Sequence, residues 1–243
     1  MAPKDGGIEL LSEEHFSQTN PWGKPVVGWK PTSQGVDGLH NPSGWALLRG
    51  VLWKLLNGEK TSLYDSPMIV ENPGAIVIAE IDGRIGLSRN YRMIGERLLP
   101  KAAADYIREL ESQKLWQALF ATLGKWSWEA PRGLFNDPDA KKEEDLAAFI
   151  LKTAKAEALE EAGFTLTEAR IVGKINANTT FFAHSQWVVH GKIKSMGEAK
   201  PENLEIIGNS QLFTLEELKR LNRLGEFEDG LTLAAMALCG LSL

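Results

Sequence analysis

KEEDLAAFILKTAKAEALEEAGF, residues 142–164, is the strongest helical pattern in the chain. It is rich in Ala, Leu, Lys and Glu, which favour the helix, and it contains no Gly or Pro before Gly163. Its apolar and small residues recur at helical spacing, at Leu146, Phe149, Ile150, Thr153, Ala154 and Ala158. The pattern predicts one long helix with a buried face, which ends at Gly163 because glycine tolerates the left-handed conformation that closes helices.

The last turn of this helix carries three acids that crowd one face, Glu157, Glu160 and Glu161. Like charges at this spacing repel, and anions are disfavoured at a helix C-terminus. No Lys or Arg stands three or four residues away to relieve them. Two interpretations remain open, a solvated acidic face or a site for a hard divalent cation, which prefers carboxylate oxygens.

Composition limits the classes of function. The chain has 243 residues, 43% of them hydrophobic, which supports a substantial core. A net charge of −5 gives no electrostatic case for nucleic-acid binding. It suits a protein that holds a cation and meets anionic substrates through it. The single cysteine, Cys239, allows no internal disulfide, and its apolar neighbours predict a buried, inert thiol.

The N-terminal residues lack the pattern of a signal peptide, and no apolar run reaches the length of a membrane span. We therefore expect a cytoplasmic protein with no membrane partner. Residues 1–42 are rich in Gly, Pro, Asn, Ser and Thr and predict a loop or extended arm. Residues 43–56 predict a short amphipathic helix that ends at Asn57 and Gly58. We interpret residues 1–72 as an N-terminal extension that is suited to dimer contacts.

The remaining sequence alternates between strand and helix patterns. Residues 74–90 predict a hairpin with Asp82-Gly83 at its turn. Further strands are predicted at 126–130, 169–175, 181–193 and 204–213, helices at 100–123 and 231–241, turns at 131–133 and 136–139, and a polar loop at 176–180. Thr214 and Glu217 have the spacing of a capping box at the start of another helix. Strands on both sides of a central helix predict a mixed α/β sandwich.

Four segments resemble the Nudix hydrolases. Residues 154–164, AKAEALEEAGF, match the second half of the Nudix signature, and Glu129-Ala-Pro-Arg-Gly133 is similar to the turn that opens it. Asn90-Tyr-Arg92 and Asp229-Gly-Leu-Thr-Leu-Ala-Ala235 resemble segments of the ADP-ribose and ADP-sugar pyrophosphatases. The resemblance implies a Nudix-type α/β/α sandwich with a mixed sheet over residues 73–243, plus the N-terminal extension and a helix inserted between residues 93 and 125.

The same resemblance implies a chemistry. Nudix hydrolases use a metal-activated water to cleave the pyrophosphate bond of a nucleoside diphosphate derivative, here ADP-ribose or a nucleotide sugar. It implies catalytic and metal-binding roles for Glu157, Glu160 and Glu161, with a backbone carbonyl near Arg132 or Gly133 as a further ligand. Mg²⁺ or Mn²⁺ suits such an oxygen site. The implied substrate-binding residues are Arg92, Arg132, Trp128 and His184.

The sequence also departs from the signature. Ala156 stands where the signature has an Arg, and the loop between Gly133 and Glu157 is longer than in the family. These departures motivate an alternative, a catalytically weak Nudix-fold module that binds a nucleotide. The general base stays open between His184, Glu160 and Glu161. Many relatives are homodimers that exchange N-terminal strands, so the resemblance also implies a homodimer.

Overall fold

The computed structural model describes residues 6–17, 44–70, 73–92, 125–135, 146–178, 182–201 and 206–243. These residues form two compact units. The first unit comprises residues 1–75, 133–153 and 173–187, and the second comprises residues 76–132, 154–172 and 188–243. No described helix is long and apolar enough to cross a membrane.

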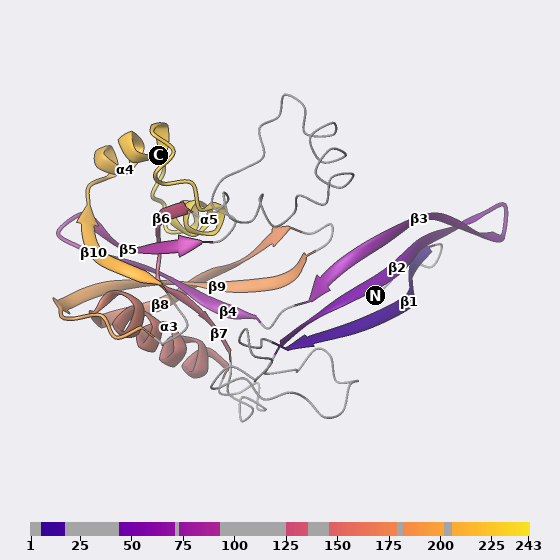
Figure 1. The fold of residues 1–243 in the computed structure, drawn as a ribbon, viewed down its shortest axis with the longest axis horizontal. Helices are drawn as coiled ribbons and strands as arrows, with labels where there is room; N and C mark the ends of the chain where they lie inside the picture. Colours follow the sequence, from indigo (N-terminus) through magenta and orange to yellow (C-terminus); the bar gives the residue numbers. More distant parts are fainter. Residues whose placement is uncertain are drawn as a thin grey trace, which may run out of the picture. The chain divides into compact units, whose positions relative to one another are not determined.

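The elements follow one another as in Figure 1. The strands are β1 (Gly6–Ser17), β2 (Gly44–Leu56), β3 (Glu59–Val70), β4 (Gly74–Ile81), β5 (Arg84–Arg92), β6 (Lys125–Glu129), β7 (Arg132–Leu134), β8 (Phe164–Asn178), β9 (Phe182–Met196) and β10 (Ile207–Phe213). The helices are α3 (Leu146–Ala162), α4 (Leu215–Arg223) and α5 (Gly230–Leu238).

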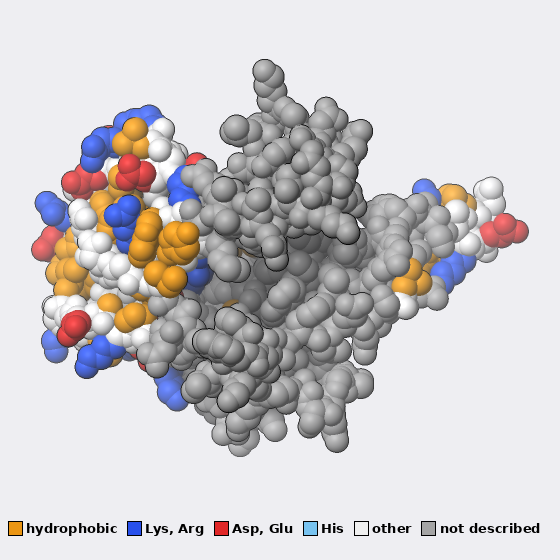
Figure 2. All heavy atoms as spheres, viewed as in Figure 1, with side chains coloured by type: hydrophobic (Ala, Val, Ile, Leu, Met, Phe, Trp, Pro, Cys, Tyr) orange, Lys and Arg blue, Asp and Glu red, His pale blue; other side chains and the backbone are white. Residues whose placement is uncertain are grey.

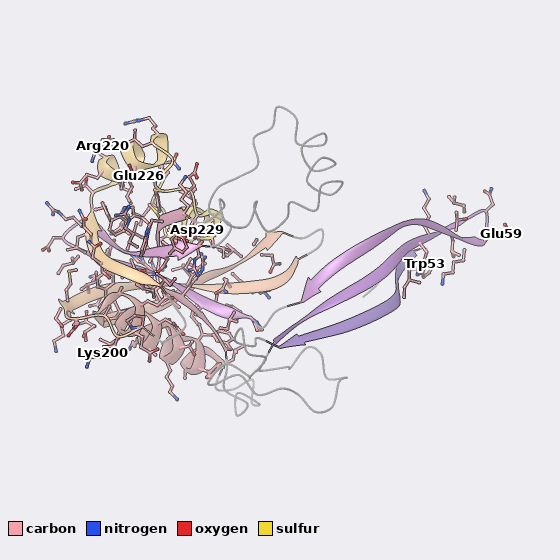
Figure 3. All side chains as sticks on the ribbon, in the orientation of Figure 1. Trp53, Glu59, Lys200, Arg220, Glu226 and Asp229 are labelled. Carbon is pink, nitrogen blue, oxygen red and sulfur yellow. The ribbon has the colours of Figure 1, made fainter. Side chains whose placement is uncertain are left out.

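The first unit contains an antiparallel ribbon of β1, β2 and β3, drawn in indigo and purple in Figure 1. At its end, β3 pairs in parallel with β9, so the sheet is mixed. Strands β2 and β3 are joined at Asn57 and Gly58, whose φ angles are +55° and +83°. Trp53 lies near this turn (Figure 3), with the Lys60 ammonium 5.0 Å from the centre of its ring.

The helix predicted over residues 43–56 is therefore wrong, because residues 44–56 form strand β2. Asn-Gly does not end a helix here. Both residues have positive φ, as a two-residue hairpin turn requires, and the turn returns the chain into β3. Eleven register pairs between β2 and β3, with one register shift between Leu52 and Trp53, then satisfy the backbone, and a local helical pattern does not reveal this pairing.

The sheet of the second unit is organised around β5. The β4–β5 hairpin turns at Asp82 and Gly83, as predicted, with φ of +50° and +73°. β10 pairs with β5 in antiparallel fashion, and β6 pairs with residues 88–92 of β5. Strand β4 is buried over Gly74–Ala79, in keeping with its continuous apolar sequence.

The β5–β6 pair presents two different faces. Ser88 lies opposite Glu129, whereas Arg89 lies opposite Trp128. Because side chains alternate along each strand, Arg92 shares a face with Glu129, and Tyr91 shares the other with Trp128. One face thus carries Arg92 and Glu129, and the other carries the aromatic rings together with Arg89.

Most of the other predicted elements are confirmed. α3 ends at Gly163, whose φ is +70°, and β6, β9, β10, α4 and α5 lie close to their predicted ranges, with the capping box of Thr214 and Glu217 formed. The turn at 131–133 is wrong, since β7 begins at Arg132 and pairs with β4. The loop at 176–180 is wrong in its first part, since β8 continues to Asn178. The helix at 100–123 and the turn at 136–139 lie outside the described residues.

Candidate functional site

Glu161 is buried at the end of α3. The buried face of this helix consists of Ile150, Ala154, Ala158, Glu161 and Ala162, and Glu161 is only 1% exposed. A carboxylate among apolar side chains needs a hydrogen-bond donor, because burial removes its water. The backbone N–H of Arg132 donates to its Oε2 at 2.9 Å. One partner of the acidic turn therefore comes from β7.

A second buried carboxylate, that of Glu129, receives two guanidinium groups. Arg92 Nε donates to Oε2 at 2.9 Å, and Arg92 Nη2 donates to the same oxygen at 2.6 Å. Arg132 Nη2 lies 3.0 Å from that oxygen. The side chain of Glu129 is 3% exposed, so both cations offset the loss of its hydration.

The first turn of α5 binds the same segment from another direction. Asp229 is the N-cap of α5, and its Oδ2 accepts from Thr232 N at 2.9 Å and from Thr232 Oγ1 at 2.7 Å. Arg132 Nη1 donates to the same Oδ2 at 2.6 Å. The Thr232 hydroxyl in turn accepts from Ala130 N at 3.0 Å. Asp229, labelled in Figure 3, and Thr232 together hold the residues from Ala130 to Arg132.

The arginines and acids stabilise one another's charged forms. Burial alone would lower the pKa of Arg92, but hydrogen bonds and charge from Glu129, with the charges of Glu161 and Asp229, raise it overall. Burial alone would raise the pKa of Asp229, but Arg132 and the two bonds from Thr232 lower it overall. At neutral pH, Arg92 is cationic and Asp229 is anionic.

The three acids of the predicted metal site differ in burial. Glu161 is buried, Glu157 lies one turn earlier and is half-buried, and Glu160 is exposed. The backbone carbonyl of Glu160 accepts from Lys200 N at 2.8 Å. Within the described part of the chain, no three Asp, Glu, His or Cys side chains are gathered as a metal-binding group.

The donor chemistry of this region nevertheless fits a hard cation. Glu157 and Glu161 offer carboxylate oxygens from adjacent turns of α3, and Mg²⁺ and Mn²⁺ favour oxygen ligands.

The other predicted site residues are more dispersed. Trp128 is buried edge-to-face against Phe213, with ring centres 4.8 Å apart, on the opposite face of β5–β6 from Glu129. It lines a cavity of about 240 Å³ with Arg220 and Glu226. Both of these residues are labelled in Figure 3. The structure thus does not bring Trp128 together with Glu161.

Gly133 and His184 fall in the first unit. The carbonyl of Gly133 lies against Gly74, where an added Cβ would come within 2.2 Å of it. The backbone of His184 is in β9, and its side chain lies outside the described part.

Figure 2 shows basic, acidic and hydrophobic side chains interspersed over the described surface of this view.

Sequence reasoning did not assign site roles to Glu129, Asp229 and Thr232. Glu129 and Asp229 were within the segments that resembled Nudix proteins, so the signal was present. Their pairing with Arg92 and Arg132 joins residues 37 and 97 positions apart, and sequence spacing does not report such contacts.

No protein-family model matches the chain, and no curated protein sequence matches it. Among solved structures, the chain is similar to one described as "Crystal structure of ADP compounds hydrolase". The similarity covers 98% of this chain and 95% of that one, with a TM-score of 0.55 and 12% sequence identity. The chain therefore shares the α/β fold of that structure, and its sheet is mixed, which confirms the predicted fold class.

Proposed function

We propose that this chain hydrolyses the pyrophosphate bond of a nucleoside diphosphate derivative, such as ADP-ribose or a nucleotide sugar, with Mg²⁺ or Mn²⁺. The observation that carries the proposal is Glu161, a buried carboxylate oriented by the Arg132 N–H at the end of α3 in a Nudix-type fold. The similar solved structure is described as a hydrolase of ADP compounds, which supports this substrate class.

In this proposal, Glu157, Glu160 and Glu161 hold the cation. A bound divalent cation supplies Lewis acidity, which makes water more acidic and offsets the charge of a diphosphate. Glu160 is the acid of this turn with greatest access to water, so we assign it the transfer of a proton. Glu161 Oε2 already accepts a hydrogen bond from Arg132 N, so we assign Glu161 the role of holding the cation.

The arginines supply positive charge beside the acids. The side chain of Arg92 is 40% exposed although its Nε and Nη2 are bonded to Glu129, so part of its guanidinium can donate to a phosphate. In this proposal the catalytic domain comprises residues 73–243, and residues 1–72 provide dimer contacts.

The alternative is a nucleotide-binding module with weak or no hydrolysis. One observation favours it: Ala156 stands where the signature has an Arg, and both nearby arginines are bonded to Glu129, which engages their charge. A module of this kind would bind ADP-ribose and be stabilised by it without forming product.

A metal-dependent assay distinguishes these functions. The purified chain is incubated with ADP-ribose and a panel of nucleotide sugars in Mg²⁺ or Mn²⁺, and release of the corresponding nucleoside monophosphate, AMP from ADP-ribose, is measured by chromatography. Glu161→Gln should lower the rate by more than about 100-fold, since losing only the group that supports a metal ligand costs about 10- to 100-fold. Glu168→Gln is the control, because Glu168 is an exposed acid on β8 paired with Lys192.

The outcomes separate clearly. AMP release that depends on metal and on Glu161 supports hydrolysis. Thermal stabilisation by ADP-ribose with no product from any member of the panel overturns hydrolysis and supports the binding module. Equal rates for the wild type and Glu161→Gln would remove Glu161 from the mechanism.

A further inference from the structure

The contacts of Arg132 connect α5 to the buried acid of α3. The backbone N–H of Arg132 donates to Glu161, while its guanidinium donates to Asp229 at 2.6 Å. Both side chains of the Arg132–Asp229 pair are less than one-fifth exposed, at 17% and 15%. A short ion pair between largely buried groups fixes the orientation of both, because neither has water as an equal alternative partner.

Asp229 is in turn fixed by its own helix. Its Oδ2 accepts the N-cap bond from Thr232 N, and the Thr232 hydroxyl links Oδ2 to Ala130 N. The first turn of α5 therefore holds the chain at two points, two residues apart, at Ala130 and at Arg132. The N–H of Arg132, at the second of these points, donates to Glu161.

We propose that Asp229 is a positioning residue for the cation site, acting through Arg132 to orient the carboxylate of Glu161. The inference rests on the proposed function. Asp229 does not itself contact the reacting atoms in this proposal. Asp229 sets the position of the Arg132 side chain. Without Asp229, the guanidinium of Arg132 would pair with Glu129 alone, and Glu129 also receives Arg92.

This role can be separated from helix capping. Asn and Asp are about equally good N-caps, so Asp229→Asn keeps an oxygen for Thr232 N and removes the charge that holds Arg132. Glu228→Gln is the matched control. It removes the same charge from the adjacent residue, whose partner is Lys125 at 3.3 Å and whose side chain is 45% exposed.

The readout is the Mn²⁺ concentration that gives half of the maximal thermal stabilisation, measured without substrate. Groups that orient a metal ligand change metal affinity by about 10- to 100-fold when removed. We expect Asp229→Asn to raise this concentration by at least about tenfold. Glu228→Gln should leave it unchanged. In turnover, Asp229→Asn should raise the Mn²⁺ requirement more than it lowers kcat at saturating Mn²⁺.

Two failures have different meanings. A wild-type chain with no Mn²⁺ response and no turnover overturns the proposed function. A wild-type response that Asp229→Asn shares, or that Glu228→Gln weakens equally, overturns the positioning role alone. If Asp229→Asn does not fold, Arg132→Lys makes the same test, because lysine keeps the charge but lacks the planar fork that reaches Glu129 and Asp229 together. A Mn²⁺ response equal to that of the wild type in Arg132→Lys would then overturn the role.

Discussion

Gly163 should tolerate no side chain, for two independent reasons. It closes α3 with φ of +70°, a conformation that L-residues other than glycine rarely adopt. A Cβ at this position would lie 2.2 Å from the carbonyl oxygen of Gly197 and 2.8 Å from its carbonyl carbon. Both are backbone atoms, and Gly197 N also donates to Gly163 O at 2.8 Å, so neither segment can move without breaking that bond.

The expected loss of stability follows from these two terms. The left-handed conformation costs an alanine about 1 kcal/mol relative to glycine. Forcing an extra carbon into a packed site costs about 1–3 kcal/mol more. Gly163→Ala should therefore lose about 3 kcal/mol, which for a chain of this size is a fall in Tm of about 6–12 °C.

Gly240→Ala is the matched control. Gly240 closes α5 with φ of +78°, and a Cβ there would meet nothing within 4 Å. It should lose only the conformational term of about 1 kcal/mol. Urea unfolding followed by circular dichroism measures both variants. If the two lose the same free energy, the close approach of Gly197 contributes nothing and the reasoning is refuted.

Two further predictions concern ionisable groups. Because its partners lower the pKa of Asp229 from the ordinary value of 3.8, its ionised form stabilises the fold above that value, and the contribution is lost as pH falls through the lowered pKa. The difference in unfolding free energy between wild type and Asp229→Asn should be constant from neutral pH to about pH 5 and shrink below about pH 4; a difference that grows on acidification contradicts it. Burial raises the pKa of the half-buried Cys239 thiol to about 11, so its alkylation rate should keep rising with pH past the ordinary value of 9.0. A plateau of the alkylation rate at or below pH 9.0 would contradict the raised pKa of Cys239.

The elements that the sequence predicted well are those with strong local signals. α3 combines helix-forming residues with a glycine stop, and the β4–β5 hairpin has Asp-Gly between two apolar runs. The prediction for residues 44–56 failed because the spacing of their apolar residues fits a strand as well as a helix. Their conformation depends on the pairing of β2 with β3. The Asn57-Gly58 pair indicated a hairpin turn, since it is as strong a hairpin signal as Asp82-Gly83.

The sequence predicted three acids of the candidate site, but it missed Glu129, Asp229 and the partners of the acids. Glu157, Glu160 and Glu161 stand out from their spacing alone. The donor to Glu161 is a backbone N–H 29 residues earlier. Residue type does not indicate which backbone N–H groups make such contacts. Likewise, the α5 contribution depends on Asp229 meeting Arg132, which are 97 residues apart.

The burial of Glu161 is itself an argument for function. Its neighbours on the buried face of α3 are Ala154, Ala158 and Ala162, which an apolar side chain would join without any desolvation cost. Replacing a buried ionic group by a well-packed apolar residue is often neutral or stabilising, so stability alone does not explain a carboxylate here. Glu160, on the same turn, keeps its charge in water, as repulsion between neighbouring acids favours. A buried acid beside other acids, with a backbone N–H donating to it and the charge of Arg92 acting on it, therefore needs an explanation beyond stability.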